Sequence, residues 1–198
     1  MHIEQFVMAY KIEQDRIRAL LPEGFTSLRP VLRINAEIRD GQRVYVEFNT
    51  PVEGKGKRGW LNIARWEGEK DGLSFQREGK AVLISAPFLD LWYEGAGIEG
   101  GCPAEKDNDG CFFHGRSPEF RPAETISEHK EFCDCRFAWK FHEGDAAGES
   151  RRETLPAYME KSSREYERKP LTAERAAAIP CIQVLGTYIV RFHRNADF

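Results

Sequence analysis

The sequence predicts a β-rich α+β fold, in which an antiparallel curved sheet or a double-sheet barrel carries a few short peripheral helices. Two observations lead to this fold class. Apolar and polar residues alternate with a period of two over several segments, as in strands that have one buried face. Helical patterns are few and do not alternate regularly with the strands, so the sequence lacks the repeated strand–helix units of a parallel sheet.

The alternation is clearest in residues 31–39 and 42–49, where the even-numbered positions from 32 to 38 and from 44 to 48 are apolar. The C-terminal segment is rich in β-branched residues, which favour strands. Helices are expected where a cap or a breaker marks an end, as Thr172 marks an N-terminus. We predict further strands at residues 60–66, 73–76, 81–85, 88–93, 132–142 and 182–193, and short helices at about residues 13–21, 155–168 and 172–179.

Charge and face together suggest a register for the first strand pair. A loop of three residues at 39–41, with its glycine in the left-handed position, keeps apolar residues on one face. It also sets Glu37 opposite Arg43 and Arg33 opposite Glu47, and opposite charges across a strand pair contribute about 0.2–1 kcal/mol each. A two-residue loop would mix the two faces, so we expect the longer one.

Composition limits the classes of protein and partner. With 198 residues, of which 41% are hydrophobic, the chain is expected to form a single domain over residues 1–198. A net charge of −3 without a basic field argues against a nucleic-acid partner. No apolar run approaches the roughly 20 residues of a spanning helix, so no membrane partner and a cytoplasmic location are expected. The five cysteines are expected to be reduced, and the sequence leaves homo-oligomer formation open.

The segment GIEGGCPAEKDNDGCFFHG, residues 97–115, carries the candidate reactive groups. Cys102 follows two glycines, where the backbone can approach a ligand closely, and a nearby His114 would lower the pKa of its thiol. Glu105 would act as a general acid or base if burial raised its pKa. Lys106 is a candidate nucleophile, although the carboxylates on both sides of it favour its charged form.

The same segment offers two sets of metal ligands. Acidic residues alternate before Gly110 as at the start of a calcium loop, but Arg116 stands where that loop needs a glutamate. A thiol and imidazole site would combine Cys102, Cys111 and His114 with either the Cys133-x-Cys135 pair or His129, although the spacing is unlike that of zinc sites. A glycine-rich turn with a solvated acidic tip is the simpler interpretation, and we expect no cofactor.

The N-terminal stretch EQFVMAYKIEQDRIRALLPEGFTSLRPVLRINAEIR, residues 4–39, resembles the acetoacetate decarboxylase superfamily. The resemblance implies a β-rich double sheet around an interior pocket. The polar positions of the first strand pair would then line that pocket, and the alternative is a solvated sheet face. The candidate ligand-binding residues are therefore Arg33, Glu37 and Glu47, together with His114.

The lysine chemistry of that superfamily is not retained. Its decarboxylases carry a Gly-aromatic-Pro-Lys-Lys stretch, in which the first lysine forms a Schiff base. The nearest match is GCPAEK, where Ala104 and Glu105 occupy the lysine positions and Lys106 comes one place late. The arginine that the resemblance implies falls nearest Ile3.

The sequence therefore predicts a protein that binds or transforms a small carbonyl or carboxylate compound in an interior pocket. Arg33 would hold the carboxylate, and the segment from Cys102 to His114 would serve as a lid or supply catalytic groups. If it is an enzyme, it is a decarboxylase-like lyase with altered catalytic residues. Two alternatives remain open: a non-enzymatic small-ligand binding protein on the same fold, and a metal-binding protein that uses the Cys102–His114 segment.

Overall fold

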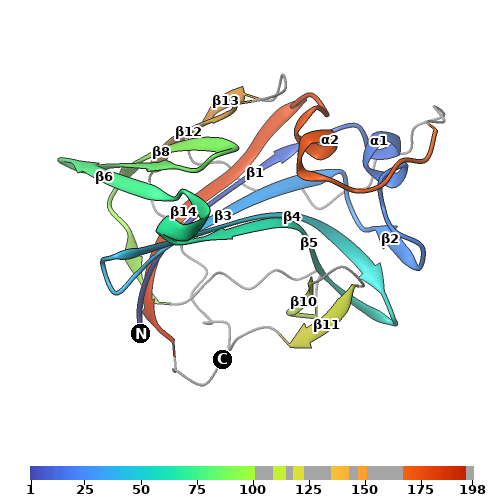
Figure 1. The fold of residues 1–198 in the computed structure, drawn as a ribbon, viewed down its shortest axis with the longest axis horizontal. Coiled ribbons are helices and arrows are strands. Elements are labelled where there is room, and N and C mark those ends of the chain that lie inside the picture. Colours follow the sequence, from blue (N-terminus) through green and yellow to red (C-terminus); the bar gives the residue numbers. More distant parts are fainter. Residues whose placement is uncertain (101–108, 115–117, 123–134, 143–146, 151–166, 195–198) are drawn as a thin grey trace.

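The computed structural model describes residues 1–100, 109–114, 118–122, 135–142, 147–150 and 167–194. Two β-sheets face each other across a shared apolar core, and the helices are short and peripheral (Figure 1). The predicted β-rich fold class is confirmed. Among the described residues no helix is long and apolar enough to cross a membrane.

The larger sheet has nine strands in the order β11-β10-β5-β4-β3-β1-β14-β9, with β2 paired to β4. Most neighbours are antiparallel, but β10 runs parallel to β5 and β9 runs parallel to β14. The strands of this sheet are β1 (His2–Lys11), β2 (Phe25–Ser27), β3 (Val31–Arg39), β4 (Arg43–Gly54), β5 (Lys57–Glu67), β9 (Ile98–Glu99), β10 (Cys111–His114), β11 (Glu119–Pro122) and β14 (Gln183–His193).

The smaller sheet has five antiparallel strands in the order β13-β12-β8-β7-β6. Its strands are β6 (Ser74–Glu78), β7 (Ala81–Ser85), β8 (Leu89–Gly95), β12 (Cys135–Phe141) and β13 (Ala147–Ser150). The predicted strands at 81–85 and 88–93 correspond closely to β7 and β8. The described strands form no closed barrel, because β11 and β9 end the order of the larger sheet without pairing to each other.

Two short α-helices and one 3-10 turn complete the described elements: α1 (Gln14–Arg18), α2 (Ala173–Ala177) and η1 (Glu69–Asp71). The hydroxyl of Thr172 accepts a hydrogen bond from the backbone N–H of Arg175 at 3.3 Å, so the predicted N-cap of α2 is confirmed. Most of the third predicted helix, at residues 155–168, lies outside the described residues.

The core lies between the two sheets and is rich in aromatic contacts. The rings of Phe6 and Tyr93 are 5.1 Å apart, and those of Phe48 and Phe141 are 5.3 Å apart, each pair joining one sheet to the other. The apolar even-numbered positions of β3 face this core. Because side chains alternate along a strand, the odd-numbered positions of β3 must face the opposite side of the larger sheet.

The predicted register of the β3–β4 hairpin was wrong, because each residue of β3 pairs with the residue of β4 that lies two positions later than predicted. Arg39 pairs with Arg43, Glu37 with Tyr45 and Arg33 with Asn49. Apolar residues still meet apolar residues, because an even shift keeps every side chain on its face. The predicted opposition of unlike charges across the pair is lost.

The turn explains the shift. Asp40 and Gly41 both have positive φ, at 51° and 67°, so the turn begins one residue later than predicted. Asp40 is fixed there by β1, since its N–H donates to the carbonyl of His2 at 2.8 Å and its carboxylate accepts from the N–H of His2 at 2.7 Å. A contact with a distant strand therefore sets a turn that local sequence alone leaves ambiguous.

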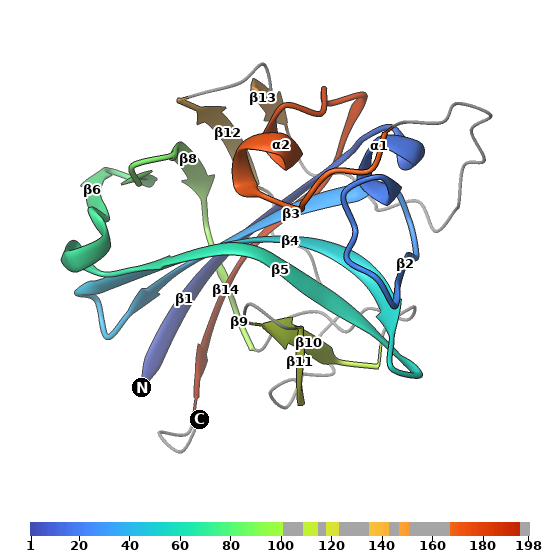
Figure 2. The same ribbon diagram turned by 45° about the vertical axis from the view of Figure 1, so that its right-hand side comes forward.

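The larger sheet curls, so that β10 and β11 lie on the side opposite the smaller sheet (Figures 1 and 2). Close approach of β10 to β5 depends on Gly59. A Cβ atom at this position would lie 2.2 Å from the backbone oxygen of Cys111, well inside contact distance. Gly59 is therefore the residue that lets β10 join the edge of the sheet.

We expect Gly59→Ala to lower the free energy of unfolding by about 1–3 kcal/mol, because the added methyl group overpacks against β10. Amide hydrogen exchange should speed up selectively at Cys111–His114. Gly56→Ala, in the same hairpin, serves as the control: its Cβ meets nothing within 4 Å, and only its φ of 72° opposes the change. It should cost about 1 kcal/mol and leave β10 protected. Equal protection of β10 in both variants would contradict this account of Gly59.

Candidate functional site

The odd-numbered side of β3 and its neighbours is buried. Arg33, Asn35, Glu37 and Glu47 are only 4%, 3%, 2% and 4% exposed, so the interpretation of this stripe as a solvated sheet face is wrong. Pairing with β4 and β5 adds further polar and aromatic side chains on the same side. We call this surface the polar face; its members are Arg33, Asn35, Glu37, Tyr45, Glu47, Asn49, Trp60 and Asn62.

The carboxylate of Glu47 is the centre of the hydrogen bonding on this face. One oxygen accepts from the side-chain amides of Asn35 and Asn49, both at 3.0 Å, and the other accepts from the hydroxyl of Tyr45 at 2.8 Å. A carboxylate only accepts hydrogen bonds, so it fixes the orientation of both amides. Burial, followed by the charge of Glu47, raises the pKa of Tyr45, which keeps the phenol protonated as a donor.

The two amides differ at their oxygen ends. The oxygen of Asn49 accepts from the amide of Asn62 at 3.2 Å, so both ends of Asn49 are bonded. The Oδ1 atom of Asn35 is buried and has no hydrogen-bond partner within the part of the chain that the structure describes. Buried polar atoms are almost always bonded, which makes this oxygen an exception on the polar face.

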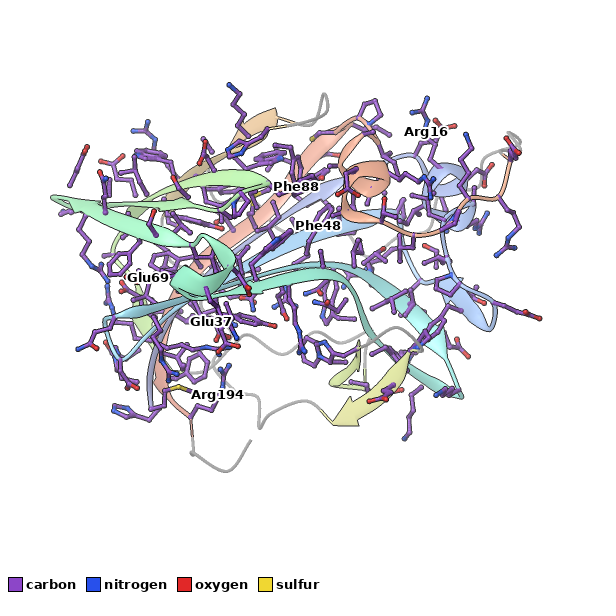
Figure 3. The ribbon with its side chains drawn as sticks, in the orientation of Figure 1. Arg16, Glu37, Phe48, Glu69, Phe88 and Arg194 are labelled. Atoms are coloured by element: carbon purple, nitrogen blue, oxygen red, sulfur yellow. The ribbon has the colours of Figure 1, made fainter. Side chains whose placement is uncertain are left out.

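Glu37 is held by arginines. Arg194 donates to both of its oxygens at 2.9 Å, and Arg39 donates to one of them at 2.8 Å. The side chains of Arg194 and Glu37 point toward each other from β14's end and from β3 (Figure 3). Burial opposes the charge of Glu37, but the hydrogen bonds and charges of the two arginines outweigh it and hold the pKa of Glu37 below its ordinary value.

Arg33 and Trp60 form the cationic end of the polar face. The guanidinium of Arg33 lies 4.6 Å from the centre of the Trp60 ring, and that of buried Arg29 lies 5.5 Å from it. A cation over an indole face gains about 0.5–2 kcal/mol, more when water is excluded. The ring thus gathers two buried positive charges at one end of the face, away from the arginines that hold Glu37.

His114 reaches the same side through β10. Phe112 pairs with Trp60 across the parallel β10–β5 contact, and His114 shares a face with Phe112 because the two residues are two positions apart on the strand. Their rings lie 6.0 Å apart. The structure therefore places His114 on the same side of the sheet as Arg33, Glu37 and Glu47, and these residues come from three strands, β10, β3 and β4.

The proposed soft-metal site is not assembled by the described residues. Cys111 and His114 are three positions apart on β10, so their side chains point to opposite faces of the sheet. Burial and then the charge of Asp109 raise the pKa of Cys111, which opposes a metal-binding thiolate. Cys135 lies in the core, with its thiol 3.7 Å from the hydroxyl of Thr187. Within the part of the chain that the structure describes, no group of three or more metal-ligating side chains occurs.

The three predicted catalytic residues, Cys102, Glu105 and Lys106, fall at 101–108 and lie outside the described residues. The same holds for His129. Their roles stay predictions. The two described strands that flank residues 101–108, β9 and β10, stand near opposite ends of the strand order of the larger sheet.

An open surface depression of about 540 Å³ lies away from the polar face, lined by residues 21–25 and 168–170. There the Arg168 guanidinium donates to the carbonyl of Leu21 at 2.9 Å, and the N–H of Lys169 donates to the carbonyl of Ala19 at 3.0 Å. These contacts dock a late segment onto the end of α1. The depression gathers no set of reactive side chains, so we place the candidate site on the polar face.

Several members of the site were not identified from the sequence. Tyr45 and Asn49 had a usable signal, since they alternate with the apolar positions of β4. Asn62 and Trp60 depend on the β4–β5 register, which shifts at a bulge between Phe48 and Asn49. Arg194 lies beyond the last predicted strand and gave no signal.

Solved structures with similar folds are acetoacetate decarboxylase-like proteins. The match to the acetoacetate decarboxylase of Legionella pneumophila covers 96% of this chain and 81% of that chain, with a TM-score of 0.49 and 12% identity. The match to an acetoacetate decarboxylase-like enzyme from Sphingomonas wittichii covers 69% of this chain and 70% of that chain, with a TM-score of 0.41 and 10% identity. The match to the enduracididine biosynthesis enzyme MppR, complexed with pyruvate, covers 95% of this chain and 83% of that chain, with a TM-score of 0.47 and 10% identity.

No protein-family profile matches the chain, and no curated protein matches its sequence. The structural matches and the resemblance of residues 4–39 name the same group of proteins, at low sequence identity. With identities of 10–12% and TM-scores below 0.5, the matches transfer no residue role and no reaction to this chain.

We expect Arg194→Gln to destabilise the protein by about 3 kcal/mol at pH 7, since it leaves a buried carboxylate without its two-point partner. In the wild type, the stabilisation by Glu37 is fully present above an ordinary carboxyl pKa of about 4.3 and is lost as the pH falls through the lower folded-state pKa. In the variant the folded-state pKa is higher, so less stability is lost on acidification, and the two proteins should converge in stability as the pH falls. Urea unfolding between pH 3 and pH 7 measures both effects.

Arg18→Gln is the matched control, because Arg18 forms an exposed ion pair with Asp15 at 3.1 Å. It should change stability little at any pH. Identical pH profiles for the two variants would contradict the assignment of the acid sensitivity to Glu37.

Proposed function

We propose that the polar face binds a small carboxylate or carbonyl compound, with Arg33 holding the carboxylate. The observation that carries this proposal is the burial of a row of polar side chains on the side of the sheet away from the core. Burying such groups is costly unless they are bonded within the protein or serve a ligand. We also propose that residues 1–198 act as a single domain, since the shared core draws on both sheets.

The chemistry of Arg33 suits a carboxylate. A guanidinium presents a planar fork of donors that matches two carboxylate oxygens, and the pair is stronger where water is excluded. Contact with the Trp60 ring restricts where the guanidinium can lie. His114, which stands on the same side, supplies a further polar group for the ligand. Glu37 already receives hydrogen bonds on both oxygens, so in this proposal it acts on the ligand through its charge and through the position of Arg194.

A purely binding role has specific support as the second candidate function. Both acidic side chains of the polar face accept several hydrogen bonds, and the raised pKa of Tyr45 disfavours its use as a base. Groups held in this way bind and orient better than they exchange protons. Transformation of the ligand would require Cys102, Glu105 or Lys106, from the segment that connects β9 to β10.

We expect calorimetric titration at pH 7 to detect binding of at least one short carboxylic acid from a panel of two to six carbons. Arg33→Gln should weaken that binding by about 10- to 150-fold, because a hydrogen bond to a charged group contributes about 1.5–3 kcal/mol. Arg136→Gln is the matched control, since Arg136 also lies over a tryptophan, Trp92, at 5.5 Å, but is exposed on the other sheet. Equal weakening by both variants, or no binding at all, would refute the proposal.

Incubation with a 2-oxo or 3-oxo acid followed by borohydride separates the lysine mechanism from the other candidates. We expect no stable mass increment, because the carboxylates of Glu105 and Asp107 beside Lys106 favour its charged form. Mass spectrometry of the digested protein provides the measurement. A label on Lys106 would instead establish a Schiff base and restore the decarboxylase-like lyase as the leading hypothesis.

A further inference from the structure

The Oδ1 atom of Asn35 is a buried acceptor to which none of the described residues donates a hydrogen bond. Asn35 is 3% exposed, and its Nδ2 atom donates to Glu47 at 3.0 Å. That contact settles which end of the amide is which, since a carboxylate cannot donate to an amide oxygen unless it is protonated. The oxygen must therefore point away from Glu47, and it has no hydrogen-bond partner there.

Asn49 shows that the network is able to satisfy such a group. It has the same side chain on the neighbouring strand and donates to the same oxygen of Glu47 at the same distance of 3.0 Å. Its own oxygen accepts from Asn62. Leaving a buried acceptor unbonded costs about 1–3 kcal/mol, so the difference between the two residues is energetically significant.

The residues directly across from this part of β3 on β1 offer no donor to Asn35. On β1, Val7 stands opposite Asn35 and Ala9 stands opposite Arg33. Both are short apolar side chains that cannot donate a hydrogen bond. On β3 itself, Arg33 lies two residues from Asn35 on the same face, about 7 Å along the strand. An unbonded acceptor thus stands next to the residue proposed to hold a carboxylate.

We propose that the ligand of the polar face carries a hydrogen-bond donor that Asn35 Oδ1 accepts. The ligand class is then a hydroxy- or amino-substituted carboxylic acid, and not the corresponding oxo acid. This inference rests on the proposed function, because it takes Arg33 as the carboxylate site. A ketone oxygen at the same place would set one acceptor against another and leave Asn35 unsatisfied.

The two ends of the ligand are separated by a short chain. Arg33 extends its guanidinium over Trp60 on β5, whereas Asn35 stays beside Glu47 on β3 and β4. The carbon atom of the ligand that carries the donor therefore has to be found by experiment. Matched pairs of acids that differ only in a hydroxyl or an oxo group provide the probes.

The experiment titrates the full-length wild-type protein with lactate and pyruvate, 3-hydroxybutyrate and acetoacetate, and 4-hydroxypentanoate and 4-oxopentanoate. In at least one pair the hydroxy acid should bind tenfold or more tightly than its oxo partner. If the oxo acid binds as tightly as the hydroxy acid in every pair that binds, this inference alone is overturned, and a water molecule satisfies Asn35. Failure of all six acids to bind would overturn the proposed function, and this inference with it.

Two variants test the residue. Asn35→Leu should bring the affinities within a pair to within about threefold of each other, because the acceptor is gone; Asn35→Val, which suits a strand, replaces it if the leucine variant does not fold. Asn49→Leu is the control, since it removes the same donor from Glu47 and leaves the acceptor of Asn35 in place. It should weaken both members of a pair together and keep their ratio. Loss of the ratio in Asn49→Leu as well would contradict the role of Asn35.

Discussion

The candidate site depends on one buried carboxylate. Glu47 lies on the side of the larger sheet that faces away from the core, and it accepts hydrogen bonds from three neutral side chains of β3 and β4. A buried carboxylate with fewer donors would be unstable, so these contacts require that the donors stand where the observed register puts them. The orientation of the two amides follows from the need to solvate this group, and its charge adds to burial in raising the pKa of Tyr45, which keeps the phenol protonated.

The two acidic residues of the polar face are stabilised in different ways. Glu37 is neutralised by arginines at 2.8 and 2.9 Å, whereas Glu47 accepts hydrogen bonds from the neutral side chains of Asn35, Tyr45 and Asn49. Arg33 and Arg29 gather at Trp60, at the other end of the face. Such a distribution favours a ligand that presents an anion at one end and donors along its length. It also explains why binding, more than proton transfer, is the chemistry that the described residues support best.

The sequence predicted the two faces of the first hairpin, because a period of two is decided by each residue and its near neighbours. Thr172 as a helix cap could be found for the same reason. The register could not, since it is set by the contact of Asp40 with His2, 38 residues away in the chain. The pairing of Arg194 with Glu37 and the close approach of β10 to Gly59 could not be predicted either, because both depend on contacts between residues far apart in the sequence. Charge and face together favoured the wrong register, because the cross-strand pairing of unlike charges was judged as at a surface, whereas Arg33, Glu37 and Glu47 are buried.

The first and last strands of the described fold, β1 and β14, lie side by side within the larger sheet, and the N-terminal amine donates to the carbonyl of Arg194 at 3.1 Å. During synthesis on the ribosome, β1 therefore waits for almost the whole polypeptide before its partner emerges. Pairing over so long a sequence separation closes a large loop, which slows folding and leaves an unpaired edge on the nascent chain. The residues around Glu37 are thus completed last, and loss of β14 would leave β1 as an unpaired edge of the larger sheet.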